Sequence, residues 1–385
     1  MPPLYFDHNA TCPLDARVRE AMLPWMGERW GNPSSIHRFG QAAQAAVEEG
    51  RERIARLIGA DPLEIVLCGS GTEANNAVVW SAVRPAVSGP RPGHLVVSAL
   101  EHPSVRAAAA HLAARGWEVT EVSPEQDGVV APPAIVAALR PETALVALQL
   151  ANNEVGTIQP VAEVAARCRE RGVPVLCDAV QAAGKIRVDF AALGVDYLVI
   201  AGHKFHGPLG AAALAIRGGA PFAPLLLGGA QERRRRASTI NVPAVVGLGA
   251  AADLARRELP ERTARLAALR DRFESGLAAI PRHVVHGTSA PRLPNTTHVA
   301  FEGLEGQTLM IRLDLAGFAV STGSACAAGV VEPSRALLAM GVSAAESIAS
   351  LRVSVGLGNS ADEVDALLAA LTREVDALRR ARAGR

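Results

Sequence analysis

The feature that most constrains the fold is a regular alternation of apolar and alanine-rich segments over residues 15–250 of this 385-residue chain. Short apolar runs predict buried strands, and the longer runs between them predict helices. This βαβ rhythm predicts an α/β fold with a mainly parallel, twisted sheet and helices on both faces. The strand–helix pairs are Ile65–Leu67 with Ala74–Val83, His94–Ser98 with Ser104–Arg115, and Ala144–Leu150 with Val161–Arg171; further strands are expected at Val173–Cys177 and Tyr197–Ile200.

The pattern changes after about residue 253 and predicts a smaller α+β domain at the C-terminal end. We assign residues 15–252 to a large domain and residues 1–14 and 253–385 to a small one. The expected elements of the small domain are a long amphipathic helix at Asp253–Ile280, strands at His283–His286 and Thr297–Phe301, a helix at Gln307–Ala316, a strand at Ser347–Val355 and a closing helix at Ala361–Arg379.

Charge and cysteine usage exclude several classes of protein. The net charge is +1, so there is no electrostatic reason to expect nucleic acid or an anionic membrane as a partner. The five cysteines are odd in number and widely spaced, and no CxxC pair occurs, which argues against a disulfide framework or a metal site. Neither a signal peptide nor a membrane span is apparent. We therefore expect a cytoplasmic protein.

Lysine is almost absent from the chain. Of the 39 basic residues only Lys185 and Lys204 are lysines. A desolvated lysine can act as an amine nucleophile, whereas arginine stays protonated. Lys204 follows the apolar run Tyr197–Ala201, which places its amine at the end of a buried strand, where open α/β sheets bind their ligands. The alternative is a surface lysine kept by chance, and this is the interpretation that we favour for Lys185.

Two segments predict a site for a phosphorylated cofactor. The glycine-rich segment Cys68–Asn75 lies between a strand and a helix, where free N–H groups and a hydroxyl of Ser70 or Thr72 could bind phosphate, or merely cap the helix. Asp178 ends another buried strand; it could cap a helix or pair with a protonated ring nitrogen. Together with the Lys204 amine, these features predict a pyridoxal phosphate site.

Four further residues have open alternatives. His102 follows a strand and could stack on a ring, shuttle protons or be structural. Asn153 also follows a strand and could belong only to a turn. Arg352 is a lone arginine in an apolar strand, so it needs either a substrate carboxylate or an internal carboxylate as partner. Cys326 lies among small residues, which favours an exposed, reactive thiol over a buried one.

Taken together, the chain resembles the cysteine desulfurases, class V members of the fold-type I pyridoxal phosphate enzymes. It is similar in particular to their mobile-loop group, which includes the NifS- and IscS-like enzymes. The segments that carry the resemblance are Tyr5-Phe-Asp-His-Asn-Ala-Thr11, Gly31-Asn-Pro-Ser-Ser-Ile-His37, Gly71-Thr-Glu-Ala-Asn75, Glu101-His102, Asn152-Asn-Glu154, Asp178-Ala-Val-Gln181, Gly202-His-Lys204, Ser238-Thr239 and Gly323-Ser-Ala-Cys326.

The resemblance implies a set of residues that hold pyridoxal 5′-phosphate. Lys204 would bind the cofactor and act as the base at the substrate Cα, and His102 would stack on the ring and assist proton transfer. Asp178 would pair with the ring nitrogen, and Gln181 would contact the ring oxygen. The remaining cofactor residues would be Gly71, Thr72, Asn153, His203 and Thr239. Of these, Thr72, His203 and Thr239 would bind phosphate, Thr239 reaching across from the other subunit of a homodimer.

The resemblance also implies the reaction. Asn153 and Arg352 would hold the carboxylate of L-cysteine. Cys326, on a loop of the small domain, would attack the substrate sulfur, so that alanine leaves and a persulfide remains for a sulfur acceptor or an iron–sulfur scaffold protein.

The chain departs from the family pattern at several places. Ala201 stands where many relatives place a serine that binds phosphate, and Arg233–Arg236 is unusually basic. The chain ends at Arg385 without the tail that some relatives use to dock a scaffold, so the partner stays open. The alternatives are a selenocysteine lyase or a class V aminotransferase on the same fold, and a catalytically silent scaffold. The presence of Cys326 argues against the first two.

Overall fold

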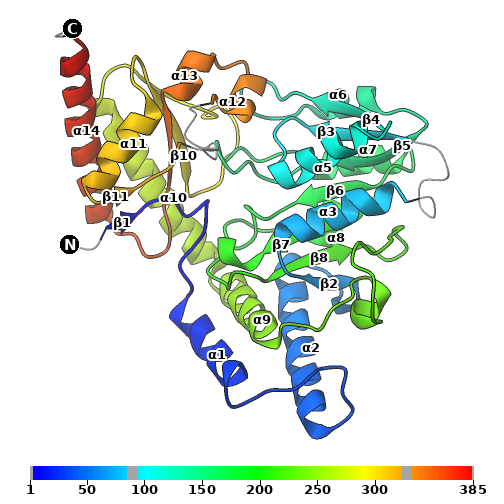
Figure 1. Ribbon diagram of the computed structural model, residues 1–385. Coiled ribbons are helices and arrows are strands. Elements are labelled where there is room, and N and C mark those ends of the chain that lie inside the picture. Colours follow the sequence, from blue (N-terminus) through cyan, green and yellow to red (C-terminus); the bar gives the residue numbers. More distant parts are fainter. Residues whose placement is uncertain (1–2, 85–92, 323–331, 384–385) are drawn as a thin grey trace.

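The chain is built around one large sheet (Figure 1). The computed structural model describes residues 3–84, 93–322 and 332–383, and within these the sheet has seven strands. In spatial order they are β2 (Ile65–Cys68), β8 (Ala212–Ile216), β7 (Tyr197–Ala201), β6 (Val175–Asp178), β5 (Thr143–Ala147), β3 (His94–Ser98) and β4 (Glu118–Val122). The strands from β7 to β4 run parallel, and β8 pairs antiparallel with β7 and β2. The predicted mainly parallel sheet is confirmed.

Helices cover both faces of this sheet because successive side chains point to opposite sides. In β7, Leu198 and Ile200 are buried on one face, in the hydrophobic cluster that also holds residues of α1, α2, α6, α7 and α9. Tyr197 and Val199 are buried on the other face with residues of α3 and α5. These helices are α1 (Ala16–Met26), α2 (Arg38–Ile58), α3 (Gly71–Ala82), α5 (Pro103–Ala113), α6 (Pro132–Ala138), α7 (Val161–Arg169) and α9 (Val242–Arg257); a short α8 (Phe190–Leu193) follows β6.

A second group of elements lies beside the large sheet, at the left of Figure 1. Its three-stranded antiparallel sheet has the order β12 (Ser350–Ser354), β10 (Thr296–Phe301), β9 (His283–Val285). The helices are α10 (Leu259–Gly276), α11 (Gly306–Leu315), α12 (Arg335–Ala339), α13 (Ala344–Ile348) and α14 (Ala361–Ala383). The N-terminal strand β1 (Leu4–Tyr5) pairs with β11 (Phe318–Ala319), and Phe6 is buried in the same cluster as the C-terminal helices. The exact domain boundaries stay a prediction.

Two elements differ from the sequence-based prediction. The expected helix Asp253–Ile280 is broken, because α9 ends at Arg257 and α10 begins at Leu259. Pro260 in the first turn of α10 has no N–H and disfavours a helical residue before it, so a continuous helix is interrupted here. The expected strand Ser347–Val355 begins only at Ser350, since Ser347 and Ile348 complete α13, which Ser343 caps. Within the described residues, no helix is long and apolar enough to cross a membrane.

Candidate active site

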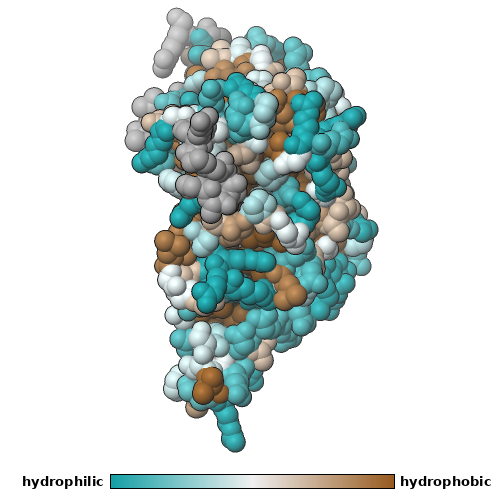
Figure 2. All heavy atoms as spheres, turned by 90° about the vertical axis from the view of Figure 1, so that its right-hand side faces the viewer, coloured by the Kyte–Doolittle hydropathy of each residue, from teal (hydrophilic) through white to brown (hydrophobic). Residues whose placement is uncertain are grey.

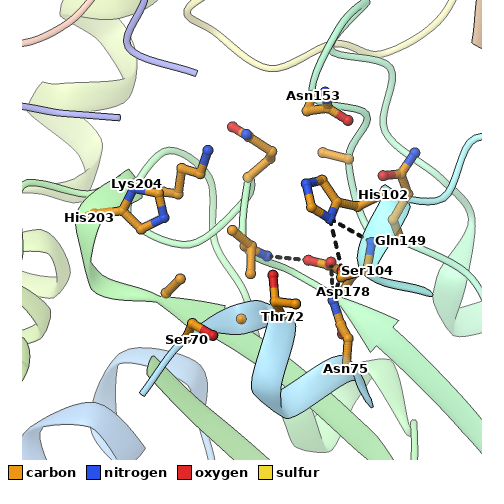
Figure 3. Close-up of a pocket in the computed structure, with 15 residues that line it drawn as sticks. Ser70, Thr72, Asn75, His102, Ser104, Gln149, Asn153, Asp178, His203 and Lys204 are labelled. Carbon is orange, nitrogen blue, oxygen red and sulfur yellow. Dashed lines mark hydrogen bonds between the residues drawn. The ribbon is translucent and has the colours of Figure 1, made fainter. Parts of the chain in front are cut away.

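A cavity of about 240 Å³ lies at the carboxyl end of the parallel strands (Figure 3). Its walls come from the segments that follow β5, β6 and β7 and from the first turns of α3 and α5. Of the residues predicted for the cofactor, those that line it are Gly71, Thr72, His102, Asn153, Asp178, Gln181, His203 and Lys204. The structure therefore gathers eight of the nine predicted positions around one cavity.

The floor of the cavity is the N-terminus of α3. Ser70 is its N-cap, and its hydroxyl accepts a hydrogen bond from Glu73 N at 3.0 Å. A Cβ added to Gly71 would lie 3.1 Å from Val180 Cγ2 and 3.7 Å from Ala201 Cβ, so a side chain at this position would crowd the floor. The helix start combines free N–H groups with a positive partial charge, which suits an anion.

Asp178 lies at the end of β6, buried beside the cavity. Its Oδ2 accepts a hydrogen bond from Asn75 Nδ2 at 2.7 Å, and its Oδ1 accepts one from Val180 N at 3.0 Å. Asn75 also donates to Ser104 Oγ at 3.0 Å. Both partners of the carboxylate are neutral, so its charge remains available to a cation in the cavity.

His102 stands opposite Lys204 and is the N-cap of α5 (Figure 3). Its Nδ1 accepts a hydrogen bond from Ser104 N at 3.1 Å and lies 2.8 Å from Ser104 Oγ. This contact leaves Nε2 to carry the ring proton. Burial lowers the pKa of His102 below its usual value, although the carboxylate of Asp178 opposes the shift. The imidazole is therefore neutral at pH 7.

Lys204 follows β7 in a short 3-10 turn, and its amine points into the cavity (Figure 3). Nζ donates hydrogen bonds to the backbone oxygens of Asn9 at 2.6 Å and Ala10 at 2.8 Å. Burial, and next the charge of Arg352, lower the pKa of Lys204 to about 8. About a tenth of the amine is thus unprotonated at pH 7 and about half at pH 8, which supplies the neutral amine that a nucleophile requires.

Lys185 is not at the surface, so that prediction is wrong. The residue is 4% exposed, and its Nζ donates to Asn9 Oδ1 at 3.0 Å and Gln181 Oε1 at 2.9 Å. It is buried because the N-terminal segment around Asn9 covers the turn that follows β6. Nothing local in the sequence reveals this contact.

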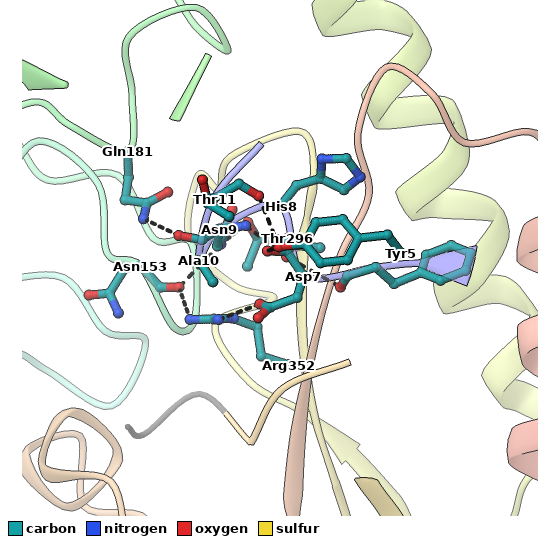
Figure 4. Close-up of polar contacts among 12 residues, drawn as sticks. Tyr5, Asp7, His8, Asn9, Ala10, Thr11, Asn153, Gln181, Thr296 and Arg352 are labelled. Atoms are coloured by element: carbon teal, nitrogen blue, oxygen red, sulfur yellow. Dashed lines mark hydrogen bonds and ion pairs between the residues drawn. The ribbon is translucent and has the colours of Figure 1, made fainter. Parts of the chain in front are cut away.

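The N-terminal segment also supplies the partner of Arg352 (Figure 4). The guanidinium forms an ion pair with Asp7 Oδ1 at 2.6 Å and donates to the Asn153 backbone oxygen at 3.0 Å. Of the two alternatives left open for this arginine, the structure contains the internal carboxylate. The Nε atom is buried without a hydrogen-bond partner among the described residues, and Arg352 does not line the cavity.

Besides Arg352, one predicted residue that the structure describes does not line this cavity. Thr239 follows the basic segment Arg233–Arg236 and is not among the lining residues. Cys326 lies outside the described residues. The prediction, in turn, missed the roles of Asn75, Ser104 and Asn9. Asn75 and Asn9 lie within recognisable motifs, but their hydrogen bonds to Asp178 and to Lys204 join segments more than 100 residues apart.

Comparisons with a family model, with curated relatives and with solved structures all indicate the same family. The aminotransferase class-V family model matches residues 4–367. The chain is 41% identical over 377 residues to a cysteine desulfurase IscS of Methanosarcina thermophila, covering 98% of this chain and 93% of the relative. A solved NifS-like protein superposes with a TM-score of 0.90 at 34% identity, covering 97% of this chain and 99% of that one. A structure described as SspA in complex with cysteine has a TM-score of 0.82 at 31% identity, with coverages of 92% and 99%.

Proposed function

We propose that this chain, which belongs to the class V aminotransferase family and to its cysteine desulfurase group, uses pyridoxal 5′-phosphate to remove sulfur from L-cysteine. The observation that carries the proposal is the convergence of Lys204, Asp178 and His102 with the start of α3 on one cavity. The names of the relatives, and the presence of cysteine in one solved relative, support the choice of substrate.

The residues present fit this cofactor. The space kept open by Gly71 at the start of α3 suits a phosphate, which the hydroxyls of Ser70 and Thr72 can also contact. Ala201 offers no hydroxyl, so the phosphate depends on the backbone, on these two side chains, on His203 and on Thr239 of the partner subunit. Asp178 is free of cationic partners in the described part of the chain and can hold a protonated ring nitrogen.

When bound, pyridoxal phosphate supplies an aldehyde that captures amines and a cationic ring that stabilises negative charge at the substrate Cα. Lys204, with its lowered pKa of about 8, holds the cofactor through its amine and later moves a proton at Cα. Asp178 keeps the ring nitrogen charged. His102 stays neutral and presents Nε2–H, while Asn153 and Arg352 bind the substrate carboxylate. Because Arg352 is already paired with Asp7, the substrate carboxylate has to share or displace that partner.

The sulfur step belongs to Cys326. Its thiolate attacks the sulfur of the substrate, so a sulfur–sulfur bond forms as the substrate carbon–sulfur bond breaks. The electron pair of the broken bond stays with the carbon, which takes up a proton to give alanine. The enzyme is left with a persulfide that a sulfur acceptor or an iron–sulfur scaffold protein can receive.

The protein acts as a homodimer in which Thr239 of each subunit contacts the phosphate of the cofactor that is bound in the other subunit. Support comes from apolar residues exposed around the α1–α2 connection, near the lower end of the molecule in Figures 1 and 2. Trp30 is 65% exposed, Ile36 is 91% exposed, and Trp30 stacks on the half-exposed Phe39 with ring centroids 4.9 Å apart. Large apolar side chains that are exposed close together in the chain, two of them stacked on each other, are typical of an interface. Sedimentation of the holoenzyme at low micromolar concentration tests this, and a stable, active monomer would contradict it.

We place the protein in the cytoplasm. Cys12, Cys68, Cys168 and Cys177 are all buried free thiols, which suits a reducing compartment.

The decisive test of the activity is alanine release from L-cysteine by the purified, cofactor-loaded protein. A cysteine desulfurase yields alanine and a persulfide on Cys326, detectable by mass spectrometry of the cysteine-loaded enzyme. Absence of a visible cofactor band, or a persulfide on another cysteine only, would refute the proposal.

A further inference from the structure

The second lysine of the chain is buried directly behind the cavity, among neutral partners. Lys185 Nζ contacts two side-chain amide oxygens, those of Asn9 and Gln181, and no salt bridge involves it within the described residues. Burial lowers the pKa of Lys185 to about 7. A buried amine without a carboxylate costs stability, whereas an apolar side chain of similar length would not. Its presence is therefore not explained by stability.

A lysine ammonium donates hydrogen bonds and accepts none, and the neutral amine still has two N–H donors, one for each of the two amide oxygens. The two amide groups beside it must therefore turn their oxygens towards Nζ. The amide nitrogen of Gln181 is consequently on the other side, where it donates to the Asn9 backbone oxygen at 2.9 Å. That nitrogen carries a second hydrogen, and Gln181 lines the cavity.

Asn9 connects this lysine to the catalytic one, and Figure 4 shows its contacts with Asn153 and Gln181. Its Oδ1 accepts from Lys185 and from Asn295 Nδ2, both at 3.0 Å, and its Nδ2 donates to Asn153 O at 3.1 Å. Its backbone oxygen accepts from Lys204 Nζ at 2.6 Å. A residue held at its side-chain oxygen, side-chain nitrogen and backbone oxygen has little freedom to move.

We propose that Lys185 is a positioning residue. Its amine fixes the amide orientation of Gln181, so that Gln181 presents an N–H donor to the cofactor, and it helps to hold Asn9, whose backbone oxygen accepts from the Lys204 amine. The inference rests on the proposed binding of pyridoxal phosphate. Without the amine, only the hydrogen bond to the Asn9 backbone oxygen opposes a half-turn of the Gln181 amide. A half-turn would bring the amide oxygen to the ring oxygen and exchange an attraction for a repulsion.

The test is the affinity of the apoprotein for pyridoxal phosphate, followed by visible absorbance, in Lys185→Met, Gln181→Met and the double variant. Lys185→Met removes the donors and keeps the length of the side chain. We expect its dissociation constant to rise about tenfold, which corresponds to the loss of about one hydrogen bond. Because the amine acts through Gln181, the double variant should bind about as weakly as Gln181→Met alone.

A matched control separates positioning from packing. The Thr263 hydroxyl donates to the Lys185 backbone oxygen at 2.8 Å, so Thr263→Val loosens the same turn and leaves the amine in place. Thr263→Val should bind the cofactor like the wild type even where its melting temperature falls. If Lys185→Met does not fold, Lys185→Gln, which can still donate to one oxygen, is expected to bind with intermediate affinity.

Three results would overturn the proposal. They are wild-type affinity in the lysine variants, additive effects of Lys185→Met and Gln181→Met, and an equal loss of affinity in Thr263→Val. Failure of the proposed function is distinguishable from each of them, because it would appear in the wild type as an absent cofactor band or absent alanine release.

Discussion

Replacing Glu232 by glutamine should destabilise the protein substantially. Its carboxylate forms a bidentate pair with Arg51, at 2.7 and 2.8 Å, and accepts a hydrogen bond from Leu67 N at 2.8 Å. The side chains are 1% and 3% exposed, so Glu232→Gln leaves the Arg51 charge buried beside a neutral amide. Removing one partner of a buried ion pair lowers the free energy of unfolding by roughly 3–5 kcal/mol. Because the glutamine amide oxygen can still accept a hydrogen bond, we expect a loss of about 3 kcal/mol for this variant.

That cost converts into a measurable shift of the melting temperature. An unfolding entropy of about 2.1 cal/mol/K per residue gives about 0.8 kcal/mol/K for the 385 residues, so about 3 kcal/mol corresponds to about 4 °C. Circular dichroism of the apoproteins is the assay. Asp365→Asn is the matched control, because Asp365 pairs with Arg272 at the surface, and its melting temperature should equal that of the wild type. The double variant Arg51→Met with Glu232→Met leaves no unpaired buried charge, so its melting temperature should lie closer to that of the wild type than the melting temperature of either single variant.

The same pair holds a strained backbone. Glu232, Arg233 and Arg234 have φ values of 47°, 55° and 64°, and such left-handed conformations cost roughly 1–2 kcal/mol for each non-glycine residue. Loss of the pair with Arg51 would let the backbone of residues 232–234 relax to a less strained conformation. Thr239, the predicted phosphate ligand, lies only a few residues further along the chain. Glu232→Gln should therefore also weaken cofactor binding. An unchanged melting temperature would refute the reasoning on the buried pair, whatever the effect on the cofactor.

Three other outcomes follow from the site. Lys204→Arg should abolish the visible absorbance of bound cofactor; an absorbance scan checks this, and a retained band would remove Lys204 from its role. Cys326→Ser should bind cofactor normally and respond spectrally to cysteine, yet release almost no alanine; near-normal turnover would favour a selenocysteine lyase or an aminotransferase. Because burial lowers the pKa of Lys204 from 10.5 to about 8, its neutral form predominates above pH 8. The rate at which the apoprotein captures pyridoxal phosphate, measured by stopped-flow absorbance, should rise with pH and level off above about 8, and a rise that continues towards pH 10 would contradict this.

The sequence was informative where structure is determined locally. Asp178 ends an apolar run, Lys204 follows one, and Ser70 and Gly71 stand between a strand and a helix; parallel strands then bring their carboxyl ends together at one edge of the sheet. The elements that carry the cavity could thus be predicted from short stretches of chain.

Contacts between distant segments could not be predicted in this way. Arg352 and Asp7 are 345 positions apart, and the sequence offered no reason to prefer that carboxylate to a substrate. Lys185 looks like an ordinary turn residue until the N-terminal segment lies over it. The break between α9 and α10 is different, because a local signal for it exists. Pro260 predicts a break in the helix, but the apolar periodicity on either side of it favours one continuous helix.

The scarcity of lysine has a practical consequence for following motion in this protein. An endoprotease that cleaves only after lysine has two internal targets, Lys185 and Lys204, and one is buried while the other points into the cavity. Neither bond can enter a protease while the N-terminal segment around Asn9 covers the turn after β6 and holds the Lys204 amine. The rate of cleavage in native buffer therefore reports how often that segment lifts away, and cofactor that ties down Lys204 should slow it. The chain carries its own probe for the opening of its active site.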